Sequence, residues 1–168
     1  DLAGPAYFDH VSMAAPSRSG TTHLTIETIL QGEGWDKGWG TLKAVSGNFR
    51  EVTERSFGVP EAVNSGQVGY GIVIDFFAFT SQASGFPVKF VYPSVTTIVP
   101  ANVGIVANAP NKAGAEAFIE FLLSPAGQTI LFEPGVRRLP VNPAAYDKAP
   151  KDYPNPFKDP RLNSMIKF

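Results

Sequence analysis

The chain has 168 residues, of which 43% are hydrophobic and 17% charged, and this composition is typical of a folded domain and not of a disordered segment. The formal net charge is −1 and the charged residues are scattered, so we expect no nucleic-acid partner. Cysteine is absent, which excludes disulfides, thiol catalysis and cysteine-based metal sites. No apolar run reaches the roughly 18 residues that a membrane helix needs, so we expect no direct membrane insertion.

The N-terminal region predicts one strand followed by two helices. Residues 8–15 roughly alternate apolar and polar side chains, as in a short strand. The capping residues at 17–22 then precede a helix over 23–31. Trp35 and Trp39 lie at helical spacing on one apolar face of a second helix, so we expect both in the core.

A short helix, a buried strand and a further helix follow. We expect Ser56 to cap the short helix, which runs through Val63. Residues 68–74 are apolar with two glycines and predict a buried strand, after which Asp75 caps the next helix. Residues 88–92 alternate again and predict another strand.

The second half of the chain is β-rich at first and then helical. Residues 97–107 contain one proline and predict an edge strand or a crossover. The clearest helix of the chain covers 113–123, and a second helix over 125–132 starts with proline at its first position. The proline-rich region from Pro134 onward predicts an extended tail, with a short helix near 162–166.

This alternation of strands and helices predicts an α/β fold. Prolines at positions 93 and 100 mark the best internal boundary. We therefore expect a three-layer α/β/α lobe over residues 1–95 and a separate C-terminal piece over residues 96–168.

The strongest indication of chemistry is the junction between the first strand and the first helix. A helix N-terminus presents unsatisfied N–H groups and the positive end of the helix dipole, glycine permits close approach, and hydroxyls add donors. Phosphate, phosphonate or carboxylate suits such a place, and an arginine adds a formal charge. The alternative is an ordinary Ser/Thr helix cap with nothing bound. The candidate ligand-binding residues are Ser17, Arg18, Ser19, Gly20, Thr21 and Thr22.

Several segments, taken together and in order, resemble a known family over almost the whole chain. These segments are Pro16-Ser17-Arg18-Ser19-Gly20-Thr21, Gly34-Trp35-Asp36-Lys37-Gly38-Trp39, Gly47-Asn48, Asn64 to Gly71, Val91-Tyr92-Pro93 and Phe121 to Gln128. The family that they resemble is the periplasmic solute-binding proteins of ABC transporters with the type II fold, in the group that binds ferric iron, phosphonates or organophosphates.

The resemblance implies a periplasmic-binding-protein-like lobe over residues 1–95, the second lobe of such a protein. Residues 96–168 are then the closing elements of the first lobe, and we expect the chain to be the C-terminal portion of a longer protein. The implied function is capture of a small anionic solute between two lobes and delivery to ABC transporter permease subunits. It further implies a monomer without cofactor or enzymatic activity, in the periplasm, or lipid-anchored in a host without an outer membrane.

The resemblance also bears on the ligand. Iron-binding members have two adjacent tyrosines after the strand that matches 68–74, where this chain has Phe76 and Phe77. Phenylalanine offers no oxygen to a hard cation, so ferric iron is the less favoured ligand and no metal site is expected. Asp75 is the further candidate ligand-binding residue, accepting hydrogen bonds from solute hydroxyls or an amine. The alternative is that Asp75 only caps its helix.

Two other functions remain open from the sequence. A sensory or regulatory domain can use the same fold to report a ligand to a receptor, since fold does not fix function. A phosphate-ester hydrolase needs a nucleophile with a base, or a metal, and the sequence shows no convincing set of either. We therefore expect a binding protein and not an enzyme.

Overall fold

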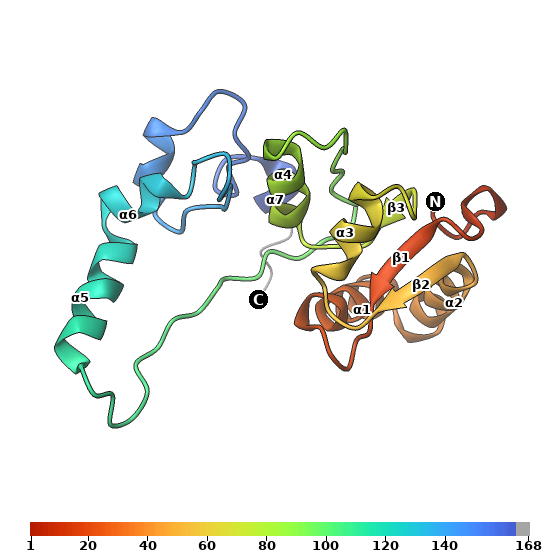
Figure 1. Ribbon diagram of the computed structural model, residues 1–168, viewed down its shortest axis with the longest axis horizontal. Coiled ribbons are helices and arrows are strands. Elements are labelled where there is room, and N and C mark those ends of the chain that lie inside the picture. The colour runs from red at the N-terminus through yellow and green to blue at the C-terminus, as the bar shows by residue number, and fades with distance from the viewer. Residues whose placement is uncertain (164–168) are drawn as a thin grey trace. The chain divides into compact units, whose positions relative to one another are not determined.

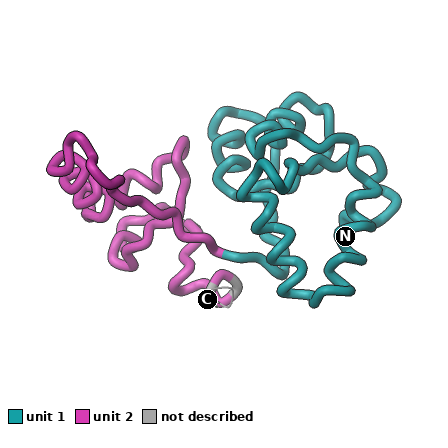
Figure 2. Tube along the Cα trace, turned by 90° about the horizontal axis from the view of Figure 1, so that it is seen from below, with its two compact units in different colours: residues 1–97 teal, residues 98–168 magenta. Residues whose placement is uncertain are grey.

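The computed structural model describes residues 1–163 and divides into two compact units, shown in different colours in Figure 2. Unit 1 is Asp1–Thr97 and unit 2 begins at Ile98. This division lies close to the expected boundary at residues 95 and 96. The assignment of the two units to different lobes of a binding protein remains a prediction.

Unit 1 contains a small sheet and four α-helices, labelled in Figure 1. In chain order, its elements are a 3-10 helix Pro5–Tyr7, β1 Val11–Ala14, α1 Gly20–Glu33, α2 Trp35–Ser46, β2 Phe49–Thr53, α3 Gly58–Asn64, β3 Tyr70–Gly71 and α4 Asp75–Ala83.

The sheet has the strand order β2-β1-β3, and both pairings are parallel. All four residues of the central strand β1 are buried, as expected for a strand covered on both faces. The chain crosses from β1 to β2 through α1 and α2, and from β2 past β1 to β3 through α3. Because these crossovers run in opposite directions, right-handed connections place α1 and α2 on one face and α3 on the other (Figure 1). The α/β fold with helix layers on both faces is therefore confirmed.

The predicted strands were less accurate than the predicted helices. The sequence did not reveal β2, whose residues are alternately half-buried and exposed and include two charged side chains. Within 68–74 only Tyr70 and Gly71 pair with β1. The predicted strand at 88–92 was wrong, because these residues have no paired strand in the described part of the chain. Residues 97–107 form no edge strand there either, and their alternative interpretation as a crossover remains a prediction.

The start of α1 was also misplaced, at residue 23 instead of Gly20. The helix starts three residues earlier because the Ser19 side chain caps it, accepting the N–H of Thr22. For α3, the expected cap at Ser56 was wrong, since the N-cap residue is Phe57 and no side chain caps this helix.

The two tryptophans of α2 are not in the core, contrary to the prediction. Trp35 is 68% exposed and Trp39 37% exposed, and their rings pack on each other at a centroid distance of 5.7 Å. The buried residue of α2 is Gly38, where an added Cβ would lie 3.0 Å from the Cα of Leu30 in α1. A glycine, and not the tryptophan face, therefore makes the close contact between α1 and α2.

Unit 2 contains α5 Lys112–Leu123, α6 Pro125–Ile130, a 3-10 helix Pro143–Lys148 and α7 Pro160–Asn163. Proline does occupy the first position of α6, as predicted. The proline-rich tail is less extended than expected because it forms the 3-10 helix, and residues 164–166 of the expected last helix lie outside the described residues.

The core of unit 2 is a cluster of Phe132, Ala145 and Tyr146. The Tyr146 hydroxyl donates a hydrogen bond to the Pro140 carbonyl at 3.1 Å, and burial, with a smaller contribution from Tyr153, raises the pKa of this phenol. The hydroxyl thus stays protonated and keeps donating, which holds the tail against the core.

The close packing of α3 on β3 gives a first testable prediction. A Cβ at residue 71 would lie 2.7 Å from Val59 Cγ1 and 3.0 Å from Val63 Cγ2. Gly71→Ala should therefore lower the free energy of unfolding by about 1–3 kcal/mol, the usual cost of overpacking. At Gly69 the nearest atom is the His10 carbonyl oxygen at 4.0 Å, so Gly69→Ala is the matched control. Urea denaturation measures both, and equal stability of the two variants would contradict this packing.

Candidate functional site

The geometry of the sheet singles out one edge of unit 1. After β1 the chain runs over the sheet to β2 on one side, whereas β3 lies on the other side of β1. In parallel α/β sheets, ligands bind beyond the carboxyl ends of the strands where such a change of direction occurs. Here that edge is bordered by residues 15–19, which lead into α1, and by residues 72–74, which lead into α4 (Figure 1).

The first turn of α1 presents amide groups at this edge. Ser19 Oγ accepts the N–H of Thr22 at 3.2 Å, and the Ser19 carbonyl accepts the N–H of His23 at 3.0 Å. Among residues 1–163, the N–H groups of Gly20 and Thr21 have no hydrogen-bond partner. An added Cβ at Gly20 would meet no atom within 4 Å, so the space on the side-chain side of Gly20 is open.

The predicted residues of this junction do not all have the same role. Ser19 and Thr22 are only 5% and 1% exposed, and their hydrogen bond to each other caps the helix. Gly20 is exposed and Thr21 half-buried, so these two present the unpaired amides. The cap described by the alternative interpretation is therefore present, and binding of an anion at the neighbouring amides remains a prediction.

Arg18 does not offer an unpaired charge. Its Nη2 lies 2.5 Å from Oε1 of Glu54, the residue that follows β2. The Arg18 carbonyl accepts a hydrogen bond from Nη1 of Arg55 at 3.0 Å. The side chain of Ser17, another predicted site residue, is exposed and has no hydrogen bond among the described residues. Arg55 is a cation at this edge that the sequence analysis missed, because it follows a strand that was not recognised.

Asp75 lies on the neighbouring strand connection. It is the first residue of α4, the N-cap being Ile74 and not Asp75 as predicted. Its Oδ1 accepts the N–H of Phe76 at 2.7 Å, and its Oδ2 accepts the hydroxyl of Tyr92 at 2.7 Å. No hydrogen bond links Asp75 to residues 15–22 in the described structure, so the partner that the fold gives it is Tyr92, which the sequence did not suggest.

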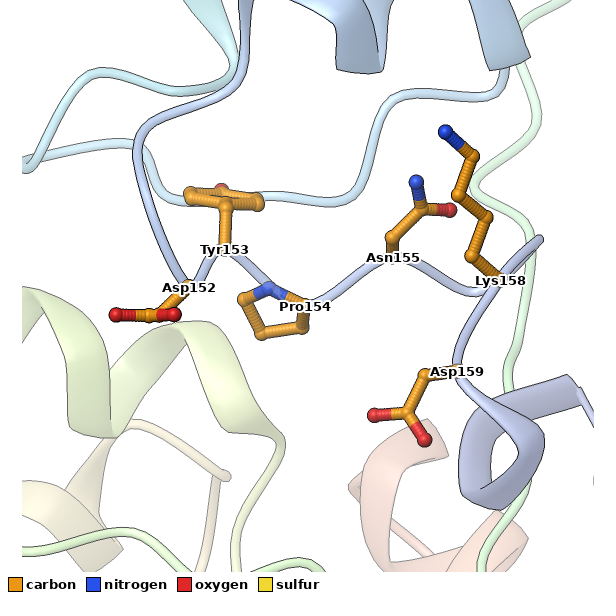
Figure 3. A pocket seen from close by; sticks show the side chains of 6 residues that line it. All are labelled: Asp152, Tyr153, Pro154, Asn155, Lys158 and Asp159. Carbon is orange, nitrogen blue, oxygen red and sulfur yellow. The ribbon is translucent and has the colours of Figure 1, made fainter.

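Unit 2 contains a hollow of about 450 Å³, shown in Figure 3. None of its residues was predicted as a site residue, and none of them is fully buried. Figure 3 shows their side chains spread along one segment, without convergence on a common point. The described residues also contain no group of three or more His, Asp or Glu that could hold a metal ion. The hollow is lined by Asp152, Tyr153, Pro154, Asn155, Lys158 and Asp159.

A parallel sheet with a helix N-terminus at this edge is typical of α/β domains that bind small ligands. The chain belongs to the family of bacterial extracellular solute-binding proteins, which it matches over residues 1–166. The resemblance seen in the sequence is thereby confirmed at the level of the family. Within the described residues, no helix has both the length and the apolar character needed to cross a membrane.

Individual relatives are consistent with this family. The chain is 39% identical over 147 residues to the phosphoglycerate transport regulatory protein PgtC of Salmonella typhimurium, covering 88% of this chain and 37% of PgtC. It superposes with a TM-score of 0.70 on the periplasmic binding protein AfuA from Actinobacillus pleuropneumoniae, solved with fructose-6-phosphate bound, at 27% identity over 81% of this chain and 43% of AfuA. The periplasmic binding protein P5PA gives a TM-score of 0.70 at 26% identity, over 94% of this chain and 50% of P5PA.

The comparisons differ in what they cover, and two points matter for this chain. The two solved neighbours are periplasmic binding proteins. The chain spans half or less of the length of each of these proteins, between 37% of PgtC and 50% of P5PA.

The Ser19 cap gives a second prediction. Ser19→Ala removes the acceptor of the Thr22 amide and should destabilise unit 1 by about 1 kcal/mol, as for other Ser caps. Ser17→Ala is the control, because that side chain is exposed. Denaturant unfolding without ligand measures both variants. An unchanged stability of Ser19→Ala would mean that the cap contributes nothing.

Proposed function

We propose that this chain is part of an extracytoplasmic solute-binding protein of an ABC importer, and that its solute is a small phosphorylated anion. The observation that carries the proposal is the pair of unpaired amides at Gly20 and Thr21, at the edge of the sheet where α/β domains bind ligands. Open space above Gly20 allows a phosphoryl oxygen to approach both N–H groups.

Two relatives support phosphate in preference to the other anions. PgtC is named for phosphoglycerate transport, and AfuA was solved with a sugar phosphate bound. Phosphate has several acceptor oxygens and suits a cluster of N–H and hydroxyl donors. In our proposal the N–H groups of Gly20 and Thr21 and the Ser17 hydroxyl contact the phosphoryl group, Ser19 and Thr22 hold the turn in shape, and Arg18 and Arg55 lie beside it.

Ferric iron remains the less favoured solute. Phe76 and Phe77 are half-buried, and their rings pack on each other at a centroid distance of 4.6 Å. Neither ring can supply the oxygen that a hard cation requires.

A panel of paired compounds tests the proposal. Titration calorimetry should detect binding of 3-phosphoglycerate and of fructose 6-phosphate, and none of glycerate or fructose. Because the relatives are longer, the measurement belongs on a polypeptide of their length as well as on this chain. Absence of binding by both phosphorylated compounds in the longer polypeptide would overturn the proposal.

Gly20→Val gives the third prediction, for affinity. The Cβ of a branched side chain at residue 20 would meet no atom within 4 Å, and we expect the side chain to fill the open space and block the approach to the amides. Loss of one hydrogen bond to a charged group costs about 1.5–3 kcal/mol, so the affinity should fall about tenfold or more. Gly135→Val is the control, since an added Cβ there also meets no atom within 4 Å. Full affinity in Gly20→Val would show that α1 is only capped and binds nothing.

A sensory or regulatory role is the second candidate, and the word regulatory in the name of PgtC favours it. The two roles differ in the partner of the liganded protein. A transport protein should stimulate ATP hydrolysis by the reconstituted permease complex, whereas a regulatory protein should bind the extracytoplasmic domain of a membrane receptor. We propose the permease subunits as partner and a monomer as the working form, which the molar mass from light scattering would test.

A further inference from the structure

Helix α4 and residues 88–92 are held together by contacts along their length. Asp75, Phe79 and Gln82 lie on one face of α4, at helical spacing. Gln82 Nε2 donates to the Val88 carbonyl at 2.9 Å, and the Tyr92 hydroxyl donates to Asp75 Oδ2 at 2.7 Å. The segment therefore runs antiparallel to the helix, with a hydrogen bond at each end.

Aromatic rings fill the middle of this contact. Phe79 packs edge-on against Phe90 at a centroid distance of 5.3 Å, and Phe90 packs edge-on against Tyr92 at 4.8 Å. Such edge-to-face pairs have a preferred geometry, which limits the movement of the Tyr92 ring. The Tyr92 ring, which carries the hydroxyl that contacts Asp75, is thus held by Phe90, and Phe90 is held by Phe79.

This contact leaves the Asp75 carboxylate oriented but not saturated. A carboxylate has about four lone-pair sites, and the Phe76 amide and the Tyr92 hydroxyl occupy one on each oxygen. Asp75 is half-buried, and it begins the helix that follows β3. Each oxygen can therefore accept one further hydrogen bond at the carboxyl edge of the sheet.

We propose that Tyr92 is a positioning residue, which fixes the Asp75 carboxylate so that it selects solutes with a carbon-bound hydroxyl or an amine near the phosphoryl group. This inference rests on the proposed function, and it adds the chemical feature that separates one phosphorylated solute from another. The amides of Gly20 and Thr21 contact the phosphoryl group of any such solute. Asp75, held by Tyr92, contacts the hydroxyl and distinguishes among them.

A pair of ligands that differ by one hydroxyl tests this division. The ligands are 3-phosphoglycerate and its analogue 3-(phosphonooxy)propanoate, which lacks the hydroxyl. The unaltered protein should bind 3-phosphoglycerate about tenfold or more tightly, the value of a hydrogen bond to a charged group. Asp75→Asn should abolish this preference and leave the affinity for the analogue nearly unchanged.

Tyr92→Phe keeps the ring and its contact with Phe90, so the fold should survive with a nearly unchanged melting temperature. The ratio of the two affinities should fall about three- to tenfold, because the carboxylate loses its orientation and not its charge. The double variant with Asp75→Asn should be no worse than Asp75→Asn alone. Tyr70→Phe is the control, because Tyr70 is 47% exposed and its hydroxyl makes no hydrogen bond within residues 1–163.

The outcomes distinguish failure of the positioning role of Tyr92 from failure of the proposed function. An unchanged affinity ratio in Tyr92→Phe overturns the positioning role, and so does an equal loss of affinity for both ligands, which would indicate a merely structural contact. Failure of the unaltered protein to bind either ligand overturns the proposed function, and the role of Tyr92 falls with it.

Discussion

Parallel pairing of β1 with β2 on one side and β3 on the other brings three carboxyl ends to one edge of unit 1. The residues that follow these strands supply the polar groups of the candidate site: the start of α1 after β1, Glu54 and Arg55 after β2, and Asp75 after β3. These residues are far apart in the sequence, and the parallel pairing of the strands brings them to the same edge of the sheet. The close approach of α3 to Gly71 and of α2 to Leu30 keeps the helices near enough to maintain this arrangement.

The helices could be predicted because helix formation depends on local spacing and capping. The predicted helix at 113–123 differs from α5 by a single residue at its start. Strands depend on a partner, which no local pattern reveals, and so β2 was missed while 88–92 was wrongly predicted as a strand. Periodicity also failed to tell which apolar face is buried: the Trp35 face of α2 is exposed because Gly38 makes the contact with α1.

The candidate site also has a local part, which the sequence could predict, and a part that depends on long-range contacts. The helix start at residues 17–22 is a local feature, and the sequence predicted these residues as its capping region, although it placed the first helical residue at 23 instead of Gly20. The partners of Arg18 and Asp75 could not be predicted, because the contacts of Arg18 with Glu54 and of Asp75 with Tyr92 span 36 and 17 residues of chain. Such contacts depend on how the chain returns to the sheet edge, and neighbouring residues in the sequence do not determine that path.

The ion pair between Arg18 and Glu54 has an electrostatic consequence for the edge it borders. Because Glu54 compensates the Arg18 guanidinium, the positive charge that this edge keeps comes from Arg55, whose Nη1 donates a hydrogen bond to the neutral Arg18 carbonyl. One guanidinium and the amide dipoles of a single helix turn attract an anion only over a short range in salt, so the rate of encounter should fall modestly as ionic strength rises. In the proposed function, discrimination among anions then rests more on the shape and hydrogen-bonding pattern of the solute than on its charge.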